Sequence, residues 1–151
     1  MLEQATEQSD RSMARAATIR LLIAEDHDVM RYTLRSVLKP YPDIEIVGEA
    51  SNGEEAVVKA EELQPAVVLM DINMPRLDGI EATRRITMKP SRMVVLGLSV
   101  HGDDALISAI LRAGAVAVVA KEKAVEDLYD AIQQAFALLS SGESTARQVP
   151  P

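Results

Sequence analysis

Short apolar runs alternate with segments of helical periodicity five times along the chain. The apolar runs cover residues 19–24, 44–48, 66–70, 93–98 and 115–120. After each run, apolar side chains recur every three or four residues, and Pro40, Pro65 and Gly114 stand where three of these segments stop. This alternation predicts an α/β fold, a doubly wound parallel sheet with helices on both faces and right-handed crossovers.

Local signals refine the expected elements. Asp28 is the expected N-cap of the first helix, and Asp103 or Asp104 is expected to start the fourth, which ends near Gly114. The other helices are expected near residues 56–63, 79–86 and 125–139. The run at 44–48 partly alternates apolar with polar residues, which favours a strand at one edge of the sheet.

Length and composition favour one domain and exclude several kinds of function. The chain has 151 residues, and we expect a flexible segment at 1–17, a folded domain at 18–139 and a linker-like tail at 140–151. A net charge of −7 argues against a nucleic-acid surface, and there is no cysteine for disulfide or thiolate chemistry. No apolar run is long enough to span a membrane, so a cytoplasmic protein is expected.

Four of the five expected strands end on polar residues. Glu25 and Asp26 follow the first strand, Asp71 the third, Ser99 the fourth and Lys121 the fifth. A single acid in such a place is more often a helix cap or a solvated loop residue. In a parallel sheet, however, all of these ends point to the same edge, where ligands bind in open α/β sheets. The joint occurrence therefore predicts a functional site.

The chemistry of this group points to phosphoryl binding. Carboxylates about 4 Å apart repel by roughly 4 kcal/mol per pair at an effective dielectric constant near 20, so the cluster needs a cation. Oxygen ligands without a His or Cys ligand select Mg²⁺ over zinc. Asp71 is then a candidate nucleophile, with Ser99 and Lys121 as donors to the phosphoryl oxygens. An aspartate with an ordinary pKa near 3.9 is ionised at pH 7 and needs no general base.

These residues resemble the receiver domain of two-component response regulators, over roughly residues 18–139. The resemblance depends on five motifs in order: Glu25-Asp26, Asp71 with Asn73-Met74-Pro75, Asp78-Gly79, Ser99 and Lys121. The segments 42–50, 52–56 and 113–115 look like the NarL-type subfamily.

The resemblance implies a flavodoxin-like (CheY-like) sheet of order 2-1-3-4-5. It also implies that Asp71 accepts a phosphoryl group from a sensor histidine kinase. Mg²⁺ would be held by Glu25, Asp26, Asp71 and the backbone carbonyl of Asn73. Ser99 would move to the phosphoryl group and Lys121 would pair with it. Such a domain is no enzyme beyond its own phosphorylation and slow dephosphorylation.

NarL-like receivers usually precede a DNA-binding output domain. No such domain lies within this chain, so DNA would be reached only through a missing output domain. A stand-alone receiver that acts by protein contacts or in a phosphorelay is the alternative interpretation.

Three positions depart from the family pattern. Glu25 replaces an aspartate, Val118 stands where an aromatic residue usually precedes the lysine, and Val100 replaces a small residue after Ser99. The first change is conservative, and the second puts an aromatic switch in doubt. We hypothesise that the branched side chain of Val100 hinders the attacking water and lengthens the lifetime of the aspartyl phosphate. The neighbouring His101 is interpreted as a solvated loop residue.

The last strand is apolar on both faces although it would lie at an edge of the sheet. An exposed apolar edge tends to be covered by another chain. We therefore expect a homodimer or output-domain interface on the face made by helix 103–113, strand 115–120 and helix 125–139. Its expected members are Ile107, Ile110, Val116, Val118 and Tyr129.

Two other classes of protein fit less well. Phosphohydrolases of the haloacid dehalogenase kind also use a strand-end aspartate with Mg²⁺, but Asn73 stands where they need a second acid. A nucleotide- or flavin-binding module would need a Gly-rich turn after the first strand, where Glu25 and Asp26 would repel a phosphate.

Overall fold

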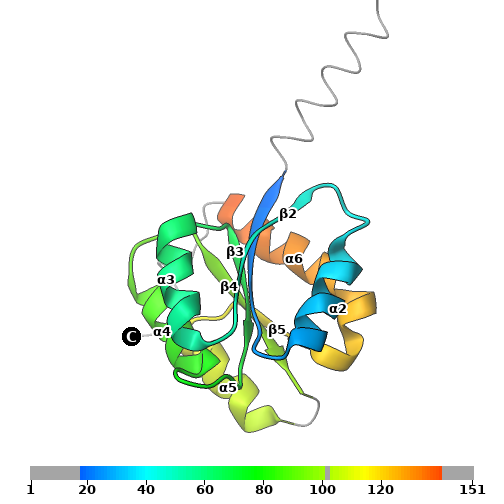
Figure 1. Cartoon of the computed structure of the whole chain (residues 1–151). Helices are drawn as coiled ribbons and strands as arrows, with labels where there is room; N and C mark the ends of the chain where they lie inside the picture. Colours follow the sequence, from blue (N-terminus) through cyan, green and yellow to red (C-terminus); the bar gives the residue numbers. More distant parts are fainter. Residues whose placement is uncertain (1–17, 101–102, 141–151) are drawn as a thin grey trace, which may run out of the picture.

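The computed structural model describes residues 18–100 and 103–140 and contains one five-stranded sheet (Figure 1). All neighbouring strands are parallel, in the order β2-β1-β3-β4-β5. The strands are β1 (Ile19–Ala24), β2 (Ile44–Ala50), β3 (Val67–Asp71), β4 (Val94–Ser99) and β5 (Ala117–Ala120). The predicted flavodoxin-like order is confirmed, and β2 lies at an edge as expected.

Helices cover both faces of the sheet. In Figure 1, α2 and α6 lie on one side, and α3, α4 and α5 lie on the other. Their bounds are α2 (Asp28–Leu38), α3 (Gly53–Leu63), α4 (Gly79–Met88), α5 (Asp104–Ala113) and α6 (Ala124–Ser140), with a 3₁₀ turn, η1 (Lys121–Lys123), before α6. Within the described residues, no helix is long and apolar enough to cross a membrane.

Each central strand contributes side chains to two separate hydrophobic cores, because successive side chains point to opposite faces of the sheet. In β1, Leu21 and Ile23 join the core under α2 and α6, whereas Leu22 joins the core under α3, α4 and α5. In β3, Leu69 and Met70 divide in the same way. The apolar runs are continuous because both faces are covered, as in parallel sheets generally.

Several expected boundaries move by one or two residues. The strand β2 continues to Ala50, and its pairing with β1 has an irregularity between Leu21 and Leu22. The last strand begins at Ala117 rather than at residue 115. The expected N-cap of the first helix is wrong: His27 holds that position without a side-chain hydrogen bond, and Asp28 lies in the first turn. Asp103 is the N-cap of α5.

One member of the expected dimer face is not available for such a contact, and a second makes contacts within the chain. Ile110 is fully buried in the core under α3, α4 and α5. Tyr129 stacks on Tyr41, with ring centroids 3.8 Å apart, and its hydroxyl donates a hydrogen bond to Asp43. The inclusion of Ile110 was wrong because helical periodicity alone does not say which side chains of a helix are fully covered, whereas Tyr129 is half-buried and its place in the interface stays a prediction.

Three expectations fall on residues that lie outside the described part of the chain. They are the flexible segment at 1–17, the tail after residue 140 and the interpretation of His101.

Candidate functional site

The loop after β3 places Asp71 at the carboxyl edge of the sheet. Asp71 is the last residue of β3, and only 2% of it is exposed. Asp78 begins α4 as its N-cap, and its side chain accepts a hydrogen bond from the backbone N–H of Glu81 at 2.8 Å. Gly79 must be a glycine here, since a Cβ would lie 2.0 Å from the carbonyl oxygen of Asp71. The motif Asp78-Gly79 thus folds the start of α4 tightly against the end of β3.

Three strand ends bring charged side chains into direct contact. Lys121 Nζ, just beyond β5, lies 2.9 Å from Asp71 Oδ1 and 2.9 Å from Glu25 Oε1, just beyond β1. Glu25 is fully buried, and the Lys121 side chain is 13% exposed. The convergence expected from the sequence is therefore present, with the lysine bridging two buried carboxylates.

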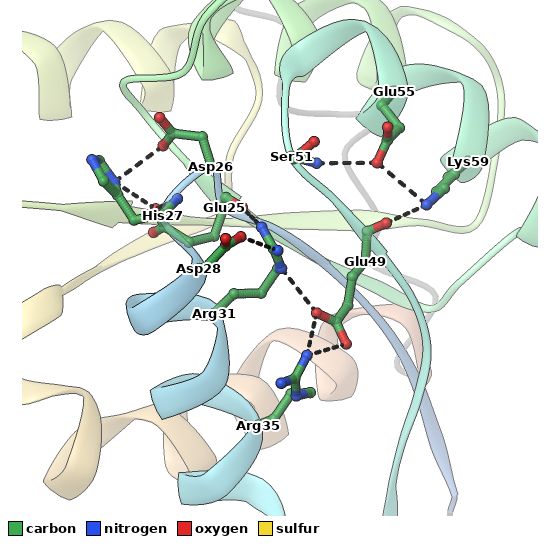
Figure 2. A network of polar contacts seen from close by, with 10 residues as sticks. All are labelled: Glu25, Asp26, His27, Asp28, Arg31, Arg35, Glu49, Ser51, Glu55 and Lys59. Carbon is green, nitrogen blue, oxygen red and sulfur yellow. Dashed lines mark hydrogen bonds and ion pairs between the residues drawn. The ribbon is translucent and has the colours of Figure 1, made fainter.

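A histidine lies among these acids, contrary to the expectation of an all-oxygen cluster. His27 Nδ1 lies 3.2 Å from Glu25 Oε2 and 3.2 Å from Asp26 Oδ1 (Figure 2). Ligand atoms of Glu25, Asp26, His27 and Asp71 all lie within 4.8 Å of one another. The argument against zinc from the lack of a nearby histidine was therefore wrong. Adjacency to Asp26 in the sequence was the signal that could have found His27.

Ser99 and Asn73 occupy the same edge of the sheet. Ser99 ends β4 and is buried, one residue beyond Leu98, the partner of Asp71 in the β3–β4 register. Asn73 is exposed, and its backbone N–H donates a hydrogen bond to Asp71 Oδ1 at 3.4 Å. The parts expected of the Ser99 hydroxyl and of the Asn73 carbonyl stay predictions.

The buried position changes the acid–base behaviour of the site. Burial raises the pKa of Asp71 to about 7, assisted by the charge of Glu25 and opposed by the hydrogen bond from Lys121. Burial alone would lower the pKa of Lys121, but its hydrogen bonds to Asp71 and Glu25 outweigh this effect and raise it. The expectation of an ordinary pKa for Asp71 was therefore wrong for the metal-free site.

The donor set suits a hard divalent cation. Asp71 Oδ2 is buried and accepts no hydrogen bond from any described residue. An unpaired buried carboxylate oxygen is costly, and a cation beside it would remove that cost and lower the pKa of the carboxyl group. Three carboxylates in one cluster fit the oxygen coordination of Mg²⁺.

The sequence of the folded region matches one family model over residues 21–133, that of the response regulator receiver domain. The chain belongs to this family. The receiver has relatives of the NarL type, as its sequence motifs suggested. It is 40% identical over 117 residues to the transcriptional regulatory protein LiaR of Bacillus subtilis, an alignment that covers 78% of the receiver chain and 56% of LiaR. It is 37% identical to the response regulator protein VraR of Staphylococcus aureus, with 84% and 59% covered.

Solved structures agree with the fold of this receiver. The response regulator domain of Thermotoga maritima CheB superposes with a TM-score of 0.73 at 35% identity, covering 80% of the receiver chain and 97% of that domain. The receiver domain of the putative regulator NarL from Mycobacterium tuberculosis gives a TM-score of 0.69 at 25% identity, with 77% and 97% covered. The chain spans a little over half the length of the curated relatives LiaR and VraR.

Proposed function

We propose that this receiver accepts a phosphoryl group on Asp71 from the phosphohistidine of a sensor kinase in the cytoplasm. The observation that carries the proposal concerns the two oxygens of the Asp71 carboxylate. Oδ1 pairs with Lys121, whereas Oδ2 is buried beside the carboxylate cluster and accepts no hydrogen bond from any described residue. A carboxylate oxygen attacks phosphorus, the bond from phosphorus to the imidazole nitrogen breaks, and the imidazole leaves.

Each residue of the site has a part in this transfer. Glu25, Asp26, Asp71 and the backbone carbonyl of Asn73 would hold Mg²⁺, which neutralises charge on the phosphoryl oxygens when bound. Lys121 keeps its positive charge next to Asp71 and pairs with the transferred group. Ser99, buried at the end of β4, donates its hydroxyl to a phosphoryl oxygen. Self-phosphorylation and slow hydrolysis are then the only reactions of the domain.

The direct test is incubation with acetyl phosphate and Mg²⁺, followed by intact mass measurement. We expect a gain of about 80 Da, the mass of one phosphoryl group in place of a proton, that disappears in Asp71→Asn and after chelation of Mg²⁺. Asp130→Asn, a change of an exposed aspartate on α6, is the matched control and should keep the gain. No gain in a folded wild-type chain would contradict the proposal.

We further propose that phosphorylation controls a DNA-binding output domain. Two relatives carry the names transcriptional regulatory protein LiaR and DegU, and the chain matches about half of each. A stand-alone receiver remains the alternative. One relative, a methylesterase/glutaminase of Myxococcus xanthus, is 47% identical over only 30% of its length, so receivers of this kind also occur in proteins with other activities. The open reading frame that encodes the chain distinguishes these cases.

A homodimer through α5, β5 and α6 stays part of the proposal, on fewer residues than the sequence suggested. Ile107, Val116 and Val118 are half-buried, and Leu111 of α5 is 42% exposed. Light scattering with and without beryllofluoride, a phosphoryl mimic, tests this interface. A strict monomer in both states contradicts it.

A further inference from the structure

Two arginines of α2 meet one glutamate at the end of β2. Arg31 and Arg35 are one helical turn apart, and both point to Glu49 (Figure 2). Arg31 Nε lies 3.0 Å from Glu49 Oε1, and Arg35 Nη1 lies 2.7 Å from Oε1 and 2.8 Å from Oε2. Lys59 of α3 donates to the backbone carbonyl of Glu49, which holds this residue from the opposite side.

Arg31 differs from Arg35 because its guanidinium also reaches the acidic site. Arg31 Nη1 donates a hydrogen bond of 2.7 Å to the backbone carbonyl of Glu25, and Nη2 donates to Asp28 Oδ1 at 2.5 Å. The Arg31 side chain is 18% exposed, whereas that of Arg35 is 42% exposed. One planar group thus joins β1, the first turn of α2 and β2, a geometry that only the fork of an arginine provides.

Glu25 is therefore held at both of its backbone polar groups. Its N–H donates to the carbonyl of Ala50 in β2 at 2.9 Å, and its carbonyl accepts from Arg31. With the backbone fixed in this way, the buried carboxylate of Glu25 is aimed at Lys121, and Asp26 follows directly. Loss of the Arg31 bond would free the peptide group that carries both acids of the pair.

We propose that Arg31, braced by Glu49, is a positioning residue that sets the Glu25–Asp26 pair for the divalent cation. This inference rests on the proposed function, because it concerns the same cation site. It also assigns a role in the site to Glu49, which lies in the NarL-like segment 42–50. The pattern of polar strand ends did not point to this residue. Partners that orient metal ligands typically contribute ten- to a hundredfold in metal affinity.

The chain offers a matched pair of variants. Arg31→Gln and Arg35→Gln each remove one arginine from Glu49, but only Arg31→Gln removes the hydrogen bond to the carbonyl of Glu25. Titration calorimetry with Mg²⁺ alone measures the dissociation constant, and thermal melts in a chelator measure stability. We expect about a tenfold weaker Mg²⁺ affinity for Arg31→Gln and less than a twofold change for Arg35→Gln.

A second readout separates positioning from a general loss of structure. In reactions with acetyl phosphate, Arg31→Gln should need about ten times more Mg²⁺ for half-maximal rate, with a similar rate at saturation. Arg31→Lys keeps the charge without the fork and should restore only part of the affinity. Should Arg31→Gln fail to fold, Arg31→Lys and Glu49→Gln carry the same measurement.

Two results would overturn the inference. One is an unchanged Mg²⁺ affinity in folded Arg31 variants, and the other is an equal loss in the Arg31 and Arg35 variants. The proposed function fails separately, when wild-type protein binds Mg²⁺ but Asp71 gains no phosphoryl group. In that case the affinity series still decides the role of Arg31.

Discussion

Burial disfavours the charged form of the Asp71 carboxyl group in the metal-free protein. Because its pKa in the folded state is raised from 3.8 to about 7, the folded state binds a proton more tightly than the unfolded state. The stability associated with this group is fully present below about pH 4 and is lost as pH rises to about 7. Asp71→Asn removes the penalty, so we expect it to stabilise the metal-free protein by on the order of 2 kcal/mol at pH 8.

Denaturant unfolding in a chelator, at about pH 5 and about pH 8, measures this effect. The stabilisation by Asp71→Asn should be larger at the higher pH, and Asp130→Asn, at an exposed position on α6, is the control variant. An equal effect of Asp71→Asn at both pH values would contradict the raised pKa.

Val100 stands beside the proposed site and is 55% exposed. It directly follows Ser99, and our hypothesis is that its branched side chain hinders the water that would attack the phosphoryl group. We expect Val100→Ala to shorten the lifetime of the aspartyl phosphate severalfold, on the order of 1 kcal/mol in the barrier to hydrolysis. Phosphate release from the purified phosphoprotein measures the lifetime. Release no faster than in wild type would refute the hypothesis.

The sequence was enough to predict which strand-end residues form the site, but not the environment of each residue. Asp71 and Lys121 follow apolar runs that are unmistakable, and a parallel sheet brings such ends together. The pKa of Asp71 depends on how completely neighbouring loops bury it, which no local pattern records. In the sequence, Arg31 is not distinguished from the other charged residues of an amphipathic helix. Its contacts to Glu25 and Glu49 arise from tertiary packing, which the sequence pattern does not show.

At the scale of elements, α6 is tied to the loop before β2 by a polar cluster. Tyr129 Oη donates to Asp43 Oδ2 at 2.6 Å, and Gln133 Nε2 donates to the same oxygen at 2.6 Å. Tyr129→Phe keeps the ring on Tyr41 and removes the hydroxyl, so we expect a loss of about 1 kcal/mol in unfolding free energy.

Denaturant unfolding checks the Tyr129 prediction, with Tyr32→Phe as the control. Tyr32 is also in a helix but is 63% exposed, so its hydroxyl should matter little. Equal effects of the two substitutions would show that the cluster at Asp43 does not hold α6.

Element types followed from periodicity, whereas element ends did not. Continuous apolar runs predicted β3 and β4 within a residue or two, since both strands are buried on both faces. At the edges this signal weakens. The expected fifth strand began at residue 115, but Ala115 and Val116 pack as a loop before β5 begins at Ala117. The N–H of Val116 does donate a hydrogen bond to the carbonyl of Val95 in β4, but the ladder of paired residues begins only at Ala117. Apolar composition reports burial, whereas a strand needs this continuous pairing.

At the scale of the whole molecule, a phosphoryl switch needs stable hydrophobic cores around a charged centre, the carboxylate cluster, which is itself destabilising. The two hydrophobic cores on either side of the sheet supply this stability. Among the described residues, the centre holds three acids and His27, and Lys121 bridges two of the acids, Glu25 and Asp71. Global stability should therefore depend on whichever cation neutralises this centre, and Mg²⁺ and Lys121 should partly substitute for each other.

Lys121→Met tests this dependence on the intact chain. In a chelator the variant should lose roughly 2–4 kcal/mol of unfolding free energy, since two buried carboxylates lose their cation. Saturating Mg²⁺ should recover more stability in the variant than in wild type, where a hundredfold excess over the dissociation constant adds about 2.7 kcal/mol. Unfolding curves with and without Mg²⁺ measure both effects, and Lys123→Met, a change of a neighbouring exposed lysine, is the control. An equal gain from Mg²⁺ in Lys121→Met and wild type would mean that the lysine and the metal ion act on separate charges.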